Sequence, residues 1–248
     1  MGRRYANPPI VEAVCAFRLT PETRWDLTVP GLLYERLKES FPQKEQRMVQ
    51  EVELTQGPEG LQQQIRTSER LLFVTEHRNL LVQVGPRLLV VNALKPYPHW
   101  EGFKPRIEMV WKSLQETIDV QGLERIGLRY INRIELSAQS RELNEYFEFY
   151  PFVGPGLPRH MTSFLVGVVF SYANDRDRCR VQLTPITHSE TEGKIAFILD
   201  LDYFLARPRG VAVVDVLDWI EEAHSRVEEA FEGCITDKLR VMFEEVSG

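Results

Sequence analysis

The chain has 248 residues, of which 43% are hydrophobic and 27% charged, and its net charge is −6. This composition excludes a disordered chain and is sufficient for a large hydrophobic core. The acidic balance argues against a dedicated nucleic-acid-binding protein and against an anionic membrane surface as partner. One local basic cluster, Arg176, Arg178 and Arg180, is interpreted mainly as solvated charge beside a turn at residues 173–175.

Cysteine usage and the first residues bear on the cellular compartment. Cys15, Cys179 and Cys234 lie far apart and form no CxxC pair, so neither a zinc site nor a disulfide framework is expected. The first residues contain neither the apolar run of a signal peptide nor a myristoylation motif. No apolar stretch approaches the roughly 20 residues of a membrane span. We therefore expect a cytoplasmic protein with no membrane partner.

The first half of the chain begins with a predicted strand at residues 9–19. Its alternation predicts one apolar face and one mixed face, and the mixed face carries Glu12 and Arg18. Pro30 and Pro42 bound a predicted short helix. Closely spaced turn residues then predict an antiparallel meander, followed by a long amphipathic helix. The predicted strands of the meander are residues 46–55, 60–67, 70–76, 79–84 and 87–94.

The second half begins with another predicted strand, at residues 123–136. Arg129, Arg133 and Glu135 lie on one of its faces, whereas Asn132 lies among apolar residues on the other. A short helix, an irregular loop, three long strands and two further helices are predicted after it. Their predicted ranges are residues 140–147, 150–160, 162–173, 178–187, 193–205, 212–232 and 236–245.

The order of elements suggests a duplicated plan. The sequence predicts an α+β fold of two similar β-α-β(3–5)-α halves, residues 1–120 and 121–248, each with a curved antiparallel sheet packed on a long helix. This plan resembles helix-grip and TATA-binding-protein-like architectures. In the latter, two halves join through their first strands. That junction would make one compact unit here and would place Glu12 opposite Arg129.

The mixed faces of the two first strands would then form one central patch. An anionic ligand suits it, because guanidinium groups bind anions in a bidentate geometry. The alternative is structural: the arginines pair with Glu12 and Glu135 and hold the halves in register. Asn132 needs a partner on the core face and is expected to bond to the backbone. The candidate ligand-binding residues are Glu12, Arg18, Arg129, Asn132, Arg133 and Glu135.

Three segments carry a resemblance to a known family. They are NPPIVEAV at residues 7–14, NAL followed by YxxWExF within residues 92–103, and LRYINRI at residues 128–134. With them the chain resembles a family of bacterial proteins of about this length that occurs sporadically and has no established function. The resemblance spans the whole chain but implies no catalytic residues. Sporadic occurrence implies an accessory role, in a defence, toxin–antitoxin or mobile-element setting.

No motif predicts chemistry. The five histidines are isolated from one another, and HExxH, Walker A, GxGxxG and GxSxG patterns are all missing, so no catalytic residue, metal site or cofactor is expected. His224 borders an apolar helix stripe and is interpreted as a packed histidine. Asp200 and Asp202 could hold magnesium together with Glu190 and Glu192. A solvent-facing strand face is the favoured interpretation of these two aspartates.

Three functions follow from these observations. The first is a non-enzymatic binding protein with a protein partner, for which the loop at residues 150–160 is a candidate contact. The second is a ligand sensor or an enzyme that holds an anionic small molecule with Arg129 and Arg133. The third, nucleic-acid binding, is the least favoured because of the acidic charge. A homodimer is compatible with all three.

Overall fold

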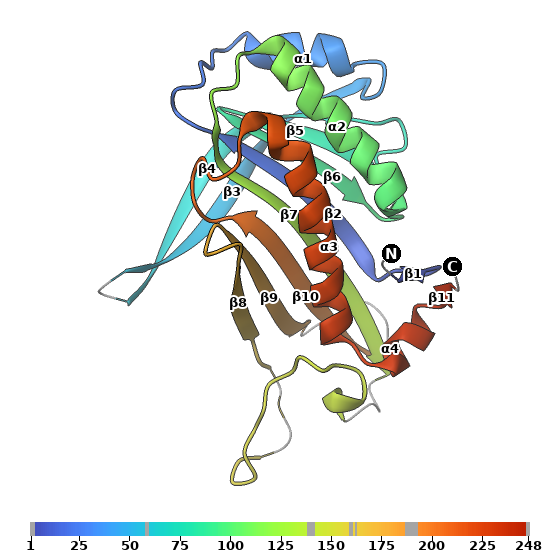
Figure 1. Cartoon of the computed structure of the whole chain (residues 1–248). Helices are drawn as coiled ribbons and strands as arrows, with labels where there is room; N and C mark the ends of the chain where they lie inside the picture. The colour runs from blue at the N-terminus through green and yellow to red at the C-terminus, as the bar shows by residue number, and fades with distance from the viewer. Residues whose placement is uncertain are drawn as a thin grey trace.

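A computed structural model describes residues 3–57, 60–137, 142–158, 161, 163–186 and 193–246, without the side chains of residues 49–68. It is an α+β protein built on one large antiparallel sheet (Figure 1). The first half comprises β1 (Arg4–Tyr5), β2 (Ile10–Leu19), α1 (Val29–Leu37), β3 (Gln43–Gly57), β4 (Gly60–Val74), β5 (Leu80–Gly85), β6 (Leu88–Leu94) and α2 (His99–Thr117). The second comprises β7 (Leu123–Ser137), η1 (Leu143–Glu145), β8 (Val166–Tyr172), β9 (Asp177–Ile186), β10 (Lys194–Leu205), η2 (Val213–Asp215), α3 (Val216–Cys234), α4 (Asp237–Met242) and β11 (Glu245–Val246).

The strand order of the large sheet is β3-β4-β5-β6-β2-β7-β10-β9-β8. The first strands of the two halves, β2 and β7, are therefore antiparallel neighbours at its centre, and this prediction is confirmed. From β2 the sheet continues outward through β6, β5, β4 and β3. From β7 it continues through β10, β9 and β8.

Two local predictions were wrong. No break occurs at residues 67–68, because β4 runs without interruption beside the whole of β3. The predicted helix at residues 140–147 is only the 3-10 turn η1, and its first two residues lie outside the described chain. A pairing that was not predicted joins β1 to β11, so the two ends of the described chain lie side by side (Figure 1).

The two sides of the sheet differ in what covers them. α1, α2 and α3 pack on one side, which we call the helix face; in Figure 1, α2 and α3 lie in front of the sheet and α1 lies beside α2 at the top. The opposite side, which we call the open face, has no helix over it among the described residues. Alternation along each strand decides which residues reach which face. On β2, for example, Ala13, Cys15 and Phe17 are buried under the helices, and Glu12, Val14 and Arg18 lie on the open face.

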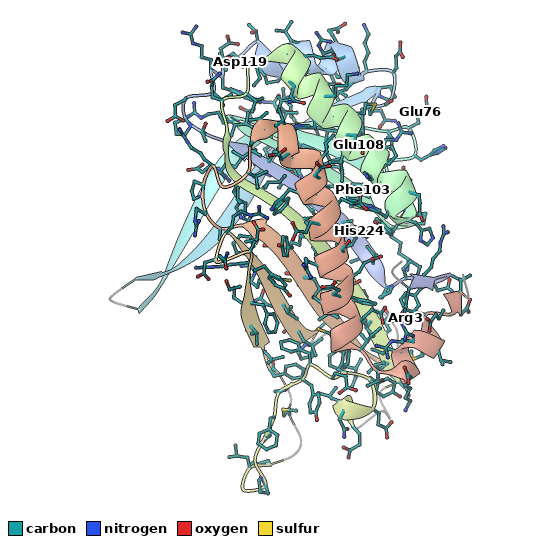
Figure 2. All side chains as sticks on the ribbon, in the orientation of Figure 1. Arg3, Glu76, Phe103, Glu108, Asp119 and His224 are labelled. Carbon is teal, nitrogen blue, oxygen red and sulfur yellow. The ribbon has the colours of Figure 1, made fainter. Side chains whose placement is uncertain are left out.

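Aromatic side chains fill the layer between the helices and the sheet. Phe17 stacks on Trp111 of α2, with ring centroids 4.8 Å apart. His224 of α3 lies between the two long helices, where Trp100 stacks on it at 4.0 Å (Figure 2). Tyr130 of β7 hydrogen-bonds to both Tyr97, at 3.1 Å, and His224, at 3.2 Å. The prediction of a packed histidine is confirmed, since His224 ties α3 to the sheet and to α2.

Membrane insertion through a helix has no support in the described chain. None of its helices combines the length and the apolar character that spanning a bilayer requires.

Candidate functional site

The structure brings three of the predicted site residues together on the open face. Glu12 and Arg18 of β2 and Arg129 of β7 line one pocket of about 280 Å³. The expected pairing of Glu12 with Arg129 was wrong, because Val14 lies opposite Arg129 and Glu12 lies opposite Ile131. The predicted alignment matched the two strands in the same direction, but they pair antiparallel, so each side chain keeps its predicted face and has another partner. Glu12 instead accepts a hydrogen bond of 2.6 Å from the Asn92 amide.

Arginines dominate this pocket, which we call the arginine pocket. Arg18 lies directly opposite Arg125 across the β2–β7 pair. Arg70, which is 6% exposed, reaches the same space from β4. Burial, and next the nearby charge of Arg18, lower the pKa of the Arg70 guanidinium. Arginine side chains from three strands thus converge on one pocket, and guanidinium groups are suited to bind an anionic group.

Two carboxylates on β10 lie beneath the arginines. Asp200 accepts two hydrogen bonds from Arg129, of 2.7 and 2.6 Å. Asp202 accepts one from Arg125 at 3.0 Å and one from Arg180 at 2.8 Å. The prediction that this strand face is solvent-facing was wrong, since both aspartates are buried. The proposed magnesium partners Glu190 and Glu192 lie outside the described residues.

Among the described residues that line the pocket, arginines are more numerous than carboxylates. A bidentate bond to Asp200 raises the pKa of Arg129, so this pair is neutral as a unit. Arg125 and Arg180 share a single aspartate. In the described part of the chain, Glu12 is the only carboxylate that lines the pocket. Among the described side chains, four arginines and one carboxylate thus line this pocket of an acidic chain.

The sequence reasoning missed an amide chain that borders the pocket. Arg70 donates to Gln83 Oε1 at 3.0 Å, and Gln83 donates to Asn92 Oδ1 at 2.9 Å. Asn92 then donates to Glu12. Asn92 interrupts the apolar strand LLVVNAL, and a polar residue in such a strand signals that it needs a partner. The chain fixes Glu12 at one end and Arg70 at the other, and so preorganises the pocket wall.

The floor of the pocket is apolar. Aliphatic side chains on β2, β6 and β7 separate the arginines. Like the arginines, these side chains occupy the alternate strand positions that point to the open face. These lining residues are Val14, Ala16, Leu88, Val90 and Ile131. An apolar floor with cations around it suits a ligand that combines an anionic group with a flat or aliphatic body.

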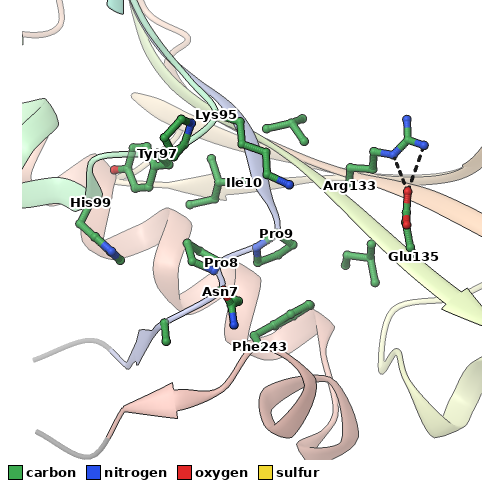
Figure 3. Close-up of a pocket in the computed structure, with 14 residues that line it drawn as sticks. Asn7, Pro8, Pro9, Ile10, Lys95, Tyr97, His99, Arg133, Glu135 and Phe243 are labelled. Carbon is green, nitrogen blue, oxygen red and sulfur yellow. Dashed lines mark hydrogen bonds and ion pairs between the residues drawn. The ribbon is translucent and has the colours of Figure 1, made fainter. Parts of the chain in front are cut away.

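Arg133 and Glu135 line a different pocket, which we call the edge pocket (Figure 3). Its volume is about 520 Å³. Arg133 donates two hydrogen bonds to Glu135, of 3.2 and 3.1 Å, so the predicted ion pairing of these two residues is confirmed. Lys194 lies 3.4 Å from the other carboxylate oxygen of Glu135. The charges that reach this pocket are thus largely engaged with one another.

Three segments that are distant in the chain meet at the edge pocket. Its walls include residues 7–11, the loop with Lys95, Tyr97 and His99, and Arg133 with its neighbour on β7 (Figure 3). Pro8 and Pro9 face Phe243 there. Together these segments join the N-terminal segment, the β6–α2 loop and the central sheet.

Asn132 does not join either pocket. It is buried on the helix face, and its amide donates to the Leu199 carbonyl at 3.1 Å. The expected bond to the backbone is confirmed, and it occupies this side chain in holding β7 to β10.

The described side chains contain no group of three potential metal ligands. Neither protein-family models nor curated proteins give a match to this sequence. Function therefore has to be inferred from the pockets and surfaces themselves.

Proposed function

We propose that this protein is a binding protein that holds an anionic group in the arginine pocket. One observation carries the proposal: Arg18, Arg70, Arg125 and Arg129, from three different strands, line a single pocket on a sheet face that no described helix covers. Several guanidinium groups around one pocket can donate together to an anion with several acceptor oxygens.

The ligand that fits best is a small organic anion. The arginines supply planar donor forks for a phosphate or carboxylate, and the apolar floor accommodates a hydrocarbon or aromatic body. The buried carboxylates Asp200 and Asp202 orient Arg129 and Arg125 from below, so the donors are held in place before the ligand arrives. A sensor or carrier role suits this arrangement, because no described side chain near the pocket offers a nucleophile and base in contact.

We also propose that the two halves arose by duplication of a helix-grip or TATA-binding-protein-like unit. The strand order supports this, because it follows the same rule in both halves. The first strand of each half is central, its last strand lies next to it, and the remaining strands follow outward in reverse order of sequence. α2 and α3 each close one half on the helix face. The arginine pocket would then lie at the junction of the two units, as the alignment of first strands predicted.

A protein partner is the second candidate function, as expected of an accessory bacterial protein in a defence, toxin–antitoxin or mobile-element setting. The specific support is the segment at residues 150–158, where Phe152 is 89% exposed and Leu157 63%. Exposed apolar residues on a loop are typical of interaction sites. A cytoplasmic location is part of this proposal, and three unpaired, buried cysteines support it.

The proposal is tested by binding of chosen anions to wild type and to the double variant R18M/R125M. Asp202 keeps Arg180 as its partner in that variant. Inorganic phosphate, succinate and a mononucleotide serve as probes in isothermal titration calorimetry. Loss of two charge-assisted contacts should raise the dissociation constant of the tightest-binding probe by about 100-fold or more. The control R178M removes an exposed arginine of β9 that lines neither pocket and should bind as wild type does.

Two results contradict the proposal. One is the lack of binding of all three anions to the wild type at millimolar concentration, and the other is equal binding by R18M/R125M and wild type. A single-stranded oligonucleotide is added as a further probe. If it binds with an affinity that falls steeply as salt rises, the open face serves nucleic acid instead.

A further inference from the structure

One edge of the large sheet lacks the features that keep sheet edges apart. β8 is the last strand on its side, and among the described residues it pairs only with β9. Its sequence, VGVVFSY, contains no charged residue and no proline. Val168, Val169 and Phe170 are 39%, 53% and 46% exposed, so apolar side chains reach solvent on both faces of the strand. An apolar edge of this kind is a template for another strand.

The opposite edge shows how this protein protects a strand that stays unpaired. β3 carries Lys44, Glu45 and Arg47 in its described part, and Glu45 forms ion pairs with Arg47 and Arg78. Charged side chains on an edge oppose pairing with a second chain. The same sheet therefore has one edge that is blocked by charge and one that is available.

The sequence of β8 is complementary to itself. In an antiparallel pair of two β8 strands centred on Val169, Val168 faces the partner's Phe170 and Val166 faces the partner's Tyr172. Gly167 faces the partner's Ser171, and Val169 faces its own copy. β-branched residues opposite aromatic residues are favourable cross-strand pairs, and no like charges meet. A two-fold axis through Val169 generates this register, and two-fold symmetry is that of most homodimers.

We propose that β8 is a homodimer interface, in which two copies pair their β8 strands antiparallel about Val169. One antiparallel sheet then runs through both copies. On each face of this sheet, the exposed side chains of β8 pack beside those of the partner's β8. β9, which carries Arg178 and Arg180, is next to β8 on each side, so the open faces of both copies form one surface. This inference is independent of the ligand proposed above.

Charge substitution at the two-fold axis tests the interface. Val169 is exposed on the open face, so V169K and V169E should fold as wild type does. Each variant alone places two like charges opposite each other and should weaken the dimer by more than about tenfold in its dissociation constant. An equimolar mixture of V169K and V169E places opposite charges there and should restore association. Analytical ultracentrifugation measures all four samples, with circular dichroism as the check of folding.

A thiol at the axis tests the register. All three native cysteines are buried, so an introduced one reacts alone. V169C should form an intermolecular disulfide under mild oxidation, because paired residues in antiparallel strands lie close enough for the bond. The matched control Q46C puts a thiol at an exposed position of the opposite edge, β3, and should remain mostly unlinked.

The outcomes separate clearly. A wild type that stays monomeric at about 100 µM overturns the proposal, as does an association that V169K leaves unchanged. The proposal is supported if wild type forms dimers, V169K alone does not, and the equimolar mixture of V169K and V169E does. Equal cross-linking of V169C and Q46C contradicts the proposed register.

Discussion

The two faces of the central sheet use the same strands for different purposes. On the helix face, two buried polar groups are fully engaged in structural hydrogen bonds: Asn132 donates to a backbone carbonyl, and Asp177 accepts from Arg176, Tyr203 and Trp219. On the open face, arginines and carboxylates form an extended network, and four of the arginines line one pocket. Buried, fully bonded polar groups hold a fold together, whereas a cluster of charged side chains in a pocket is suited to recognition.

The first way to test this comparison is to remove the anion of the helix face. D177A leaves Arg176, the Tyr203 hydroxyl and the Trp219 indole without their shared acceptor in a buried site. We expect a loss of about 3–5 kcal/mol in the free energy of unfolding, because the cost is that of orphaned buried partners. Urea denaturation followed by circular dichroism measures it.

The control for D177A is E76A, which removes an exposed carboxylate (Figure 2). It should change the free energy of unfolding by less than about 0.5 kcal/mol. A D177A protein as stable as E76A would show that the Asp177 network is not what holds α3 to β9 and β10.

The second test removes an ion pair from the open face. R129M leaves Asp200 buried without its bidentate partner, which should cost about 1–3 kcal/mol, less than D177A because Arg129 is partly exposed. The double variant R129M/D200N removes both charges and should recover most of that loss. A double-mutant cycle in urea denaturation gives the coupling between them. Additive losses would mean that Arg129 and Asp200 do not act as a pair.

The smallest expected effect concerns pH. Burial disfavours the charged form of Glu135, but hydrogen bonds from Arg133 and Lys194 outweigh it and hold its pKa below the ordinary value. A carboxylate with a lowered folded pKa stabilises the protein above its unfolded pKa, and this contribution is lost as the pH falls through the folded pKa. The free energy of unfolding of wild type should therefore decrease below about pH 4.5 more than that of E135Q.

Chemical denaturation between about pH 3 and pH 7 checks this difference. Equal pH profiles of E135Q and wild type would indicate that the three charges at the edge pocket do not stabilise the fold.

Much of the architecture could be read from local patterns. Period-two alternation identified β2 and β7 and assigned Arg129 to one face and Asn132 to the other, because adjacent side chains of a strand must point to opposite sides. Amphipathic spacing identified α2 and α3. The prediction that β2 and β7 are neighbours came from the repeated order of elements and holds in the structure.

The candidate site was predicted only in part. Alternation shows neither the relative direction nor the register of two strands, so Glu12 was assigned to Arg129 when its partner is Asn92. It also cannot show that β10 supplies the carboxylate, 71 residues after Arg129 in the chain. For the same reason Arg70 on β4 was missed, and the six predicted residues divide between two pockets and the core.

The amino-acid sequence by itself determined which segments are strands and helices, which face each side chain takes and which chemistries lack their motifs, because these depend on the spacing of neighbouring residues. Only the tertiary structure decided the lateral register, the partner of each arginine and the contrast between a charged and an apolar sheet edge. These depend on strands that are distant in the chain and are fixed by packing across the whole sheet. The arginine pocket on the open face is a product of that packing, since its four arginines come from three strands.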